Sequence, residues 1–277
     1  MTARALFAGL VASMLLSACE SSTPTAPRLA AAASPSFITN GSLDGNAHPA
    51  VVLVVMDIDG TPAFRCTGTL LSPTVVLTAG HCAGEPGEFS GMRVFTESDV
   101  QDGNNNYPFA GPNTVEAKAW HSHPQFTEAL FFLHDVGVIE LKSPINLAAS
   151  AYGRLPSANQ FDALHNGANT TFTSAGYGVQ RINPAQIQED VIREVAHPWL
   201  IQVNGPQTGT FSLLLSNNAA TGGTCFGDSG GPNYLGTSNV VAGVTSFGRS
   251  NTCGGTGGVF RLDKQDVLDF VNKYLTK

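Results

Sequence analysis

The chain has 277 residues, a length that fits one large domain or two small ones. Only 13% of the residues are charged, and glycine and proline are plentiful, which is typical of a loop-rich β protein and excludes a charged helical bundle. The formal net charge of −7 argues against nucleic acid as a partner and against electrostatic adhesion to anionic lipid.

Residues 1–18 have the pattern of a secretory signal. Arg4 precedes an apolar run over 5–16 and then small residues before Cys19. This run is too short for a good transmembrane helix. The tetrapeptide Leu-Ser-Ala-Cys at 16–19 resembles a bacterial lipobox, which implies cleavage before Cys19 and lipidation of that cysteine. An ordinary signal peptide cut near Ala18 is the alternative.

Residues 19–37 are predicted to be a disordered tether or propeptide, because Ser, Thr, Pro and Ala dominate and almost nothing can be buried. The folded part is expected to begin near Ile38. Short β-branched segments separated by turn residues then follow at spacings typical of a sandwich or barrel. They are 51–56, 64–71, 75–78, 92–96, 115–120, 136–141, 169–175, 192–195, 211–215, 240–245 and 259–260.

The segment 263–275 has a different periodicity. Val267, Leu268 and Val271 fall on one helical face, and Asp263 is a fair N-cap. We therefore predict one amphipathic helix at the end of an otherwise all-β chain.

The segment Gly227-Asp228-Ser229-Gly230-Gly231 places a serine in a glycine-rich turn. Such a turn can aim the hydroxyl of Ser229 outward and gather backbone N–H groups around an oxyanion. A surface turn that happens to hold a serine is the plain alternative. The pattern also fits the nucleophile elbow of α/β-hydrolases, but their triad needs a histidine after the serine, and none follows Ser229.

Two upstream motifs offer partners for this serine. Thr-Ala-Gly-His-Cys at 78–82 ends a predicted strand at His81, and His-Asp-Val-Gly-Val-Ile at 134–139 places Asp135 before another strand. With Gly-Asp-Ser-Gly-Gly-Pro at 227–232, they follow the order histidine, aspartate, serine. The chain from 38 to 277 thereby resembles the trypsin/chymotrypsin-like serine peptidases.

This resemblance implies an all-β fold. It predicts two Greek-key antiparallel β-barrels, over about 38–150 and about 151–262, with the active site in the cleft between them. A C-terminal α-helix over about 263–275 completes the predicted domain.

The resemblance also implies a role for each site residue. Ser229 is the expected nucleophile, His81 the general base and Asp135 the group that orients His81. The N–H groups of Gly227 and Ser229 form the expected oxyanion hole, and Ser246 is expected to support Asp135.

Four of the five cysteines are expected to form the disulfides Cys66–Cys82 and Cys225–Cys253, with Cys19 left over. The substrate pocket is expected at Gly223, Thr224, Gly248 and Gly258. Because this set contains no carboxylate, a Lys or Arg side chain of a substrate would lack a counter-charge. We predict a preference for aromatic or large apolar residues before the scissile bond.

The segment Ile38-Thr39-Asn40-Gly41 resembles the activated N-terminus of the family, although Thr39 and Asn40 depart from its pattern. The resemblance implies a zymogen. Cleavage of the Phe37–Ile38 bond would free an Ile38 ammonium to pair with Asp228, and it would also release the domain from Cys19.

The predicted function is a serine endopeptidase that hydrolyses protein or peptide substrates through an acyl-enzyme. We expect an exported monomer, lipid-anchored to a bacterial membrane at Cys19 or released extracellularly after processing near Phe37. Apart from that anchor we expect no membrane contact, and we expect no nucleic acid, no cofactor and no metal. His121-x-His123 leaves a zinc site as a minor alternative, and a catalytically silent binding or adhesion protein is the alternative function.

Overall fold

The computed structural model describes residues 38–276 except 103–104, 184–185 and 206–208. The predicted signal peptide, Cys19, the tether and Phe37 lie outside the described residues. No described helix is long and apolar enough to cross a membrane.

Strands rich in β-branched residues close into a six-stranded antiparallel barrel in the first half of the chain. In ring order they are β2 (Val51–Ile58), β3 (Thr61–Ser72), β4 (Val75–Thr78), β7 (Gly137–Leu141), β6 (Thr114–Ser122) and β5 (Gly91–Phe95). β2, β3 and β4 follow one another through short turns, and β5 returns to pair with β2. This return gives the order of a Greek key.

The second half of the chain forms an eight-stranded antiparallel sheet. Its order is β1 (Ser42–Leu43), β11 (Glu194–Ala196), β8 (Gly167–Gly176), β12 (Trp199–Gly205), β13 (Gly209–Asn217), β16 (Gly255–Arg261), β15 (Val241–Gly248) and β14 (Pro232–Leu235). A further pairing of β14 with β8 closes six of these strands into a second barrel. β14 returns beside β8 after β12 and β13, again in Greek-key order. The predicted fold class is therefore confirmed.

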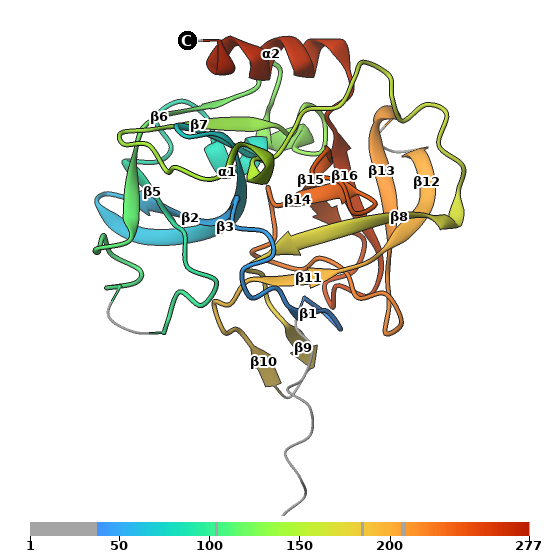
Figure 1. Ribbon diagram of the computed structural model, residues 1–277, viewed down its shortest axis with the longest axis horizontal. Helices are drawn as coiled ribbons and strands as arrows, with labels where there is room; N and C mark the ends of the chain where they lie inside the picture. Colours follow the sequence, from blue (N-terminus) through green and yellow to red (C-terminus); the bar gives the residue numbers. More distant parts are fainter. Residues whose placement is uncertain (1–37, 103–104, 184–185, 206–208, 277) are drawn as a thin grey trace, which may run out of the picture. The chain divides into compact units, whose positions relative to one another are not determined.

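The first and last elements of the described chain each contact the barrel formed by the other half of the sequence. β1, near the N-terminus, pairs with β11 of the second sheet, so the stretch before β2 does not belong wholly to the first barrel. The C-terminal helix α2 (Gln265–Leu275) instead packs against β4 and β7 of the first barrel. In Figure 1, α2 lies above β6 and β7, whereas β1 lies beside β11.

The start of α2 differs from the predicted cap. Lys264 occupies the N-cap position, and its side chain makes no capping hydrogen bond to the helix. The carboxylate of Asp263 is instead buried, where it accepts the backbone N–H of Phe161 at 2.8 Å and pairs with Arg261. Asp263 is unavailable as a cap because this buried ion pair takes its oxygens.

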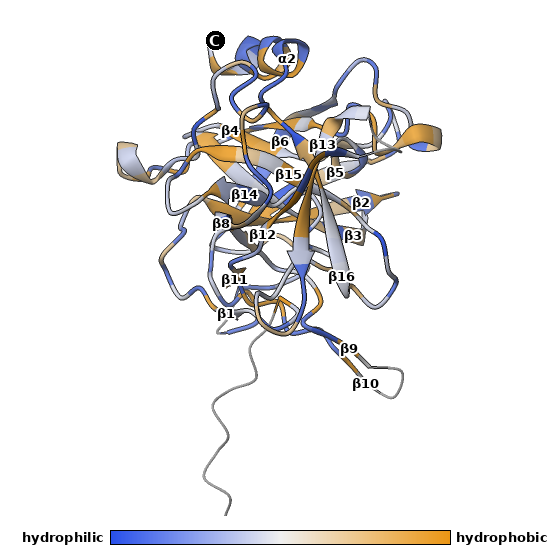
Figure 2. Cartoon of the chain, turned by 90° about the vertical axis from the view of Figure 1, so that its right-hand side faces the viewer, coloured by the Kyte–Doolittle hydropathy of each residue, from blue (hydrophilic) through white to orange (hydrophobic). Residues whose placement is uncertain are grey.

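The main hydrophobic core is shared by both barrels. β2 is almost entirely buried, and its side chains join those of β4 and β7 with second-barrel residues such as Val244 and Phe260. A smaller cluster around Phe161 and Phe172 fills the second barrel alone. In the hydropathy colouring of Figure 2, many strands are coloured as hydrophobic, whereas many of the loops that connect them are coloured as hydrophilic.

Several shorter elements complete the described chain. β9 (Arg181–Asn183) and β10 (Gln186–Gln188) form a separate hairpin. The helix α1 (Gly80–Ala83) follows β4 directly, and two 3₁₀ turns lie at η1 (Glu128–Leu130) and η2 (Ala149–Ala151).

Candidate active site

His81 is positioned by the junction between β4 and α1. Its neighbour Gly80 packs against the ring of Phe126, where an added Cβ would lie 2.7 Å from Phe126 Cδ2 and 3.1 Å from the Val136 nitrogen. Glycine fits at this position because Phe126 and the chain before β7 occupy the space that a side chain would need. The disulfide Cys66–Cys82 then ties α1 to β3.

The His81 ring faces the carboxylate of Asp135. Its Nδ1 lies 3.0 Å from each Asp135 oxygen, and the His81 backbone N–H donates to Oδ1 at 2.9 Å. Asp135 is fully buried, and its Oδ2 also accepts the hydroxyl of Ser246 at 2.5 Å. The carboxylate is therefore held from two directions while it faces the imidazole.

Burial and charge act in opposite directions on the pKa of His81. Burial disfavours the imidazolium, but the negative charge of Asp135 and its hydrogen bond favour it more strongly. The net result is a His81 pKa above the ordinary histidine value of 6.5.

The loop that carries Ser229 is fastened to β3 of the first barrel. The backbone N–H of Thr67 donates to the Ser229 carbonyl at 2.8 Å, and the Thr67 hydroxyl donates to the Gly227 carbonyl at 2.9 Å. Gly230 has φ +78°, and an added Cβ would lie 2.1 Å from Thr78 Oγ1. A side chain there would thus clash with the strand that leads to His81, so this glycine allows the two barrels to meet.

Two backbone donors in this loop remain unpaired. Within the described part of the chain, neither the Gly227 N–H nor the Ser229 N–H donates a hydrogen bond to another residue. Gly227 has φ +96°, a conformation that favours glycine. Among the described residues no hydrogen bond joins Ser229 to His81. Such contacts are often long in unliganded enzymes.

A cavity of about 240 Å³ adjoins Ser229. No carboxylate lines it; its lining residues are Phe131, Thr224, Cys225, Phe226, Ser229, Thr245, Ser246, Phe247 and Gly248. Thr224 and Gly248 from the predicted pocket thus line this cavity.

The two other predicted pocket residues do not line the cavity. An added Cβ on Gly223 would meet Asn217 at 2.2 Å, and one on Gly258 would meet the Phe247 ring at 2.3 Å. Gly223 backs onto Asn217, and Phe247 covers Gly258. The second disulfide, Cys225–Cys253, places Cys225 at the cavity wall.

Two aromatic side chains near the site, Phe131 and Phe132, are not among the residues predicted from the sequence. The ring of Phe131 meets the His81 ring edge-on at a centroid distance of 6.2 Å, and Phe132 approaches Phe247 at 6.5 Å. The only signal in the sequence was an apolar pair, Phe131-Phe132, in a segment between predicted strands.

Asp228 lies in the interior behind the serine loop. It is fully buried, and its carboxylate accepts the N–H groups of Gly178 and Cys225, each at 2.8 Å. Burial raises the pKa of Asp228 to about 7, although both hydrogen bonds oppose this shift. Ile38 is only 1% exposed, and no ion pair joins it to Asp228 in the described chain, because its nitrogen there is an amide.

A second buried carboxylate shares this interior. Glu194 on β11 lies opposite Gly176 on β8, and a Cβ on Gly176 would be 2.2 Å from Asp228 Oδ1. Opposed residues of paired strands face the same side, so Glu194 and Asp228 face one region. Neither oxygen of Glu194 has a hydrogen-bond partner among the described residues. Burial, Asp228 and Asp190 raise the pKa of Glu194 to about 9.

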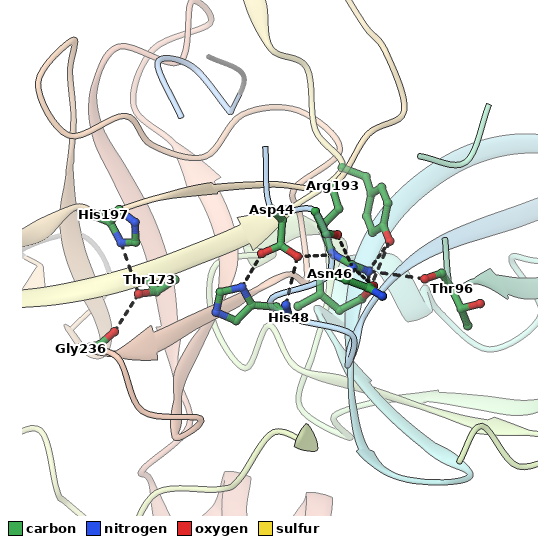
Figure 3. Close-up of polar contacts among 11 residues, drawn as sticks. Asp44, Asn46, His48, Thr96, Thr173, Arg193, His197 and Gly236 are labelled. Atoms are coloured by element: carbon green, nitrogen blue, oxygen red, sulfur yellow. Dashed lines mark hydrogen bonds and ion pairs between the residues drawn. The ribbon is translucent and has the colours of Figure 1, made fainter. Parts of the chain in front are cut away.

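The N-terminal segment is anchored by a buried ion pair. Asp44 Oδ2 accepts a 2.8 Å hydrogen bond from Nε of Arg193, and both side chains are fully buried. His48 pairs with the other Asp44 oxygen, as Figure 3 shows. Burial alone would raise the pKa of Asp44, but the hydrogen bonds from His48 and Arg193 hold it below its ordinary value.

The histidines near Asp135 do not pair as the minor zinc alternative supposed. His121 Nε2 contacts Glu140 Oε1 at 3.2 Å, whereas His123 stacks on His134 with 4.9 Å between ring centroids. Cys66, His81 and Cys82 also lie close together, but both sulfur atoms are already joined in the disulfide.

With this geometry in view, comparison with known proteins decides the family. A sequence model described as Trypsin matches residues 41–269. The chain belongs to the trypsin family. Among curated relatives, brachyurin from Leptuca pugilator is 32% identical over 197 residues, which cover 69% of this chain and 78% of the relative. A chymotrypsin from Phaedon cochleariae is 31% identical over 209 residues, which cover 73% of this chain and 69% of the relative.

Solved structures share the fold of this chain at low sequence identity. The structure titled HL collagenase superposes with a TM-score of 0.66 at 21% identity, covering 86% of this chain and 98% of that chain. The structure titled human heparin binding protein superposes with a TM-score of 0.65 at 19% identity. The superposition covers 86% of this chain and 97% of that chain. Membership in the trypsin family supports serine endopeptidase activity on protein or peptide substrates, and it fits the expected export.

Proposed function

We propose that the protein hydrolyses peptide bonds with a triad of Ser229, His81 and Asp135. The observation that carries this proposal is the paired approach of both Asp135 oxygens to His81 Nδ1 at 3.0 Å. An Nδ1–H held by a buried carboxylate leaves Nε2 unprotonated, so that Nε2 can accept a proton. Ser246 contributes by orienting the carboxylate.

The chemistry follows from these positions. Ser229 Oγ attacks the substrate carbonyl while His81 takes its proton, and the unpaired N–H groups of Gly227 and Ser229 stabilise the oxyanion. Each such donor is worth roughly 2.7–4 kcal/mol in the transition state. His81 then protonates the leaving amine, and water hydrolyses the acyl-enzyme by the reverse sequence of proton transfers.

The cavity beside Ser229 supports a preference for aromatic or large apolar side chains. It combines the Phe131 and Phe247 rings with the small residues Thr224 and Gly248, and no carboxylate lines it. A cationic substrate side chain would lose its hydration there without gaining a counter-charge.

Activation by cleavage before Ile38 is part of the proposal. The Thr39 hydroxyl donates to the Gly223 carbonyl at 3.1 Å and to Asn217 Oδ1 at 2.9 Å, so the segment already runs beside the loop that leads to Asp228. A new Ile38 ammonium would supply the cation that the buried Asp228 lacks. The proposal also includes lipidation of the exported protein at Cys19. The same cleavage before Ile38 would release the peptidase domain from this lipid anchor.

The test uses the full chain with a specific-protease site engineered to end at residue 37, before and after cleavage. The substrates are a panel of peptides that differ in the residue before the scissile bond. Ser229→Ala is the matched control. We expect cleavage after Phe, Tyr or Leu that depends on Ser229 and increases after processing. Strong cleavage after Lys or Arg, with none after Phe or Leu, would contradict the specificity.

A silent binding protein is the competing function, since the same fold carries a protein titled heparin binding protein. Covalent labelling with a fluorophosphonate separates the two functions. The enzyme labels at Ser229 after processing, whereas a processed, folded protein that does not label would favour the binding function.

A further inference from the structure

Three side chains from separate elements converge beside α2. His123 follows β6, His134 precedes β7, and Asp266 lies in the first turn of α2. One ligand atom from each lies within 4.8 Å of the other two. The combination of two imidazoles and one carboxylate is a set that zinc binds in proteins.

The spacing between two of these groups already fits a metal better than a hydrogen bond. His134 Nδ1 lies 3.5 Å from Asp266 Oδ2. Ligand atoms about 2.0–2.1 Å from a tetrahedral ion stand roughly 3.3 Å apart. His134 Nδ1 is also buried and has no hydrogen-bond partner among the described residues. A buried ring nitrogen in this state has an unmet need for a partner.

The third group, His123, is held by a hydrogen bond to one of its ring nitrogens. His123 Nδ1 accepts the backbone N–H of Gln125 at 3.2 Å, so Nε2, on a ring that also contacts the backbone of Asp266, is the nitrogen that would bind the ion. His123 is 5% exposed, and its ring stacks on His134 with an interplanar angle of 11°.

We propose that His123, His134 and Asp266 form a zinc site. Asp266 is 44% exposed, so the ion can enter from solvent on the side of α2. Three protein ligands leave a fourth position for water. The bound ion would join the start of α2 to the residue directly before Asp135, and this site is independent of the proposed peptidase activity.

A metal-free explanation exists for the same contacts. His123 also meets Phe270 at 5.1 Å between centroids, and His134 meets Phe211 at 4.9 Å, so the two histidines could serve only as packed rings. Packing accounts for the stacking, but with Asp266 Oδ2 3.5 Å away it leaves His134 Nδ1 without a hydrogen bond among the described residues. Zinc binding distinguishes the two explanations.

The experiment measures binding of zinc alone to the full chain carrying Cys19→Ser, which removes the unbridged thiol as a competing ligand. Equilibrium dialysis is expected to give one zinc per chain. At a zinc concentration about 100-fold above Kd, the melting temperature should rise by roughly 5–10 °C, and a chelator should reverse this rise.

Variants locate the ion. Asp266→Asn and His123→Asn should weaken binding by more than about 10-fold. Asn at 123 retains an acceptor for the Gln125 N–H while removing Nε2. His121→Asn, two residues away on β6, is the matched control and should bind as the parent does. Because Asp266 is partly exposed, Asp266→Asn provides the test even if His123→Asn fails to fold.

Three results would overturn the site. The parent could retain no zinc, Asp266→Asn could bind with the parental affinity, or binding could disappear in His81→Ala and persist in Asp266→Asn. The last result would place the ion at the triad histidine instead.

Discussion

The Ser246 hydroxyl on β15 donates a 2.5 Å hydrogen bond to Oδ2 of Asp135, which lies two residues before β7. The two residues are 111 positions apart and belong to different barrels. The carboxylate that faces His81 is therefore oriented by both halves of the fold at once.

Removing this bond should slow catalysis more than it disturbs the fold. A hydrogen bond to a charged group is worth about 1.5–3 kcal/mol, and each 1.36 kcal/mol of barrier is tenfold in rate. Ser246→Ala is expected to lower kcat/KM by about 10–100-fold in peptide hydrolysis. Ser238→Ala, an exposed serine whose hydroxyl donates to Leu235, is the control. Parental activity in Ser246→Ala would contradict the proposed support.

The pH dependence of hydrolysis should report the raised pKa of His81. Neutral His81 is the active base, so activity is lost as pH falls through its pKa, which lies above 6.5. The acid limb of the kcat/KM profile should therefore have its midpoint above pH 6.5. Asp135→Asn should lower kcat by about 10⁴-fold. A midpoint below 6.5 in the parent would show that Asp135 does not raise the pKa of His81.

The uncharged cavity makes a specificity change testable. Thr224→Asp places a carboxylate in its lining and should improve kcat/KM for Lys and Arg substrates relative to Phe by about 10–100-fold. Gly223→Asp is the informative comparison, because its Cβ would meet Asn217 at 2.2 Å and should disturb the loop instead. Equal gains from both variants would mean that Gly223 also reaches the substrate.

Glu194 should make the intact, unprocessed chain less stable as pH rises. Its folded pKa is about 9 and its ordinary value is 4.5, so the folded state holds a proton that the unfolded state has lost between these limits. The free energy of unfolding should fall by ~1.4 kcal/mol per pH unit from this group across that window.

Glu194→Gln removes this titration. Urea unfolding at several pH values between 5 and 9 should give a correspondingly shallower dependence in the variant. Identical slopes for parent and variant would mean that Glu194 is ionised in the folded protein.

The disulfide Cys66–Cys82 should stabilise both the fold and the position of His81. It closes a loop with a sequence separation of 16, for which the chain-entropy effect is about 3 kcal/mol. The double variant Cys66→Ala/Cys82→Ala should lose roughly this much unfolding free energy, measured in urea. Because His81 is next to Cys82, kcat/KM measured at a temperature where the variant remains folded should fall as well.

The sequence predicts most strands because their residues alternate or cluster in ways that a barrel requires. β4 is predicted to the residue, since it begins with three apolar residues directly after a turn. The short strands β1, β9 and β10 are missed, and so are the longer β12 and β14. β12 mixes Gln202 and Asn204 among apolar residues, and β14 begins with Pro232 inside the serine motif. Pairing with neighbouring strands, not local composition, makes them strands.

The site residues also differ in whether the local sequence predicts them. Ser229, His81 and Asp135 stand in contiguous motifs, so their chemistry can be read from short stretches of sequence. The group of His123, His134 and Asp266 cannot be read, because Asp266 reaches the histidines only when α2 packs against the first barrel. The need for glycine at position 80 likewise has no visible reason until Phe126 is placed beside it.

The exchange of terminal elements between barrels has a consequence for synthesis. A chain that leaves the ribosome N-terminus first completes the strands of its first barrel with β7, yet α2, which covers β4 and β7, emerges more than a hundred residues later. β1 must likewise wait for β11 before it can pair. Nascent chains therefore carry an uncovered apolar surface from the completion of β7 until α2 emerges. An export route that delays folding until the chain is complete would let α2 cover β4 and β7 as the first barrel forms.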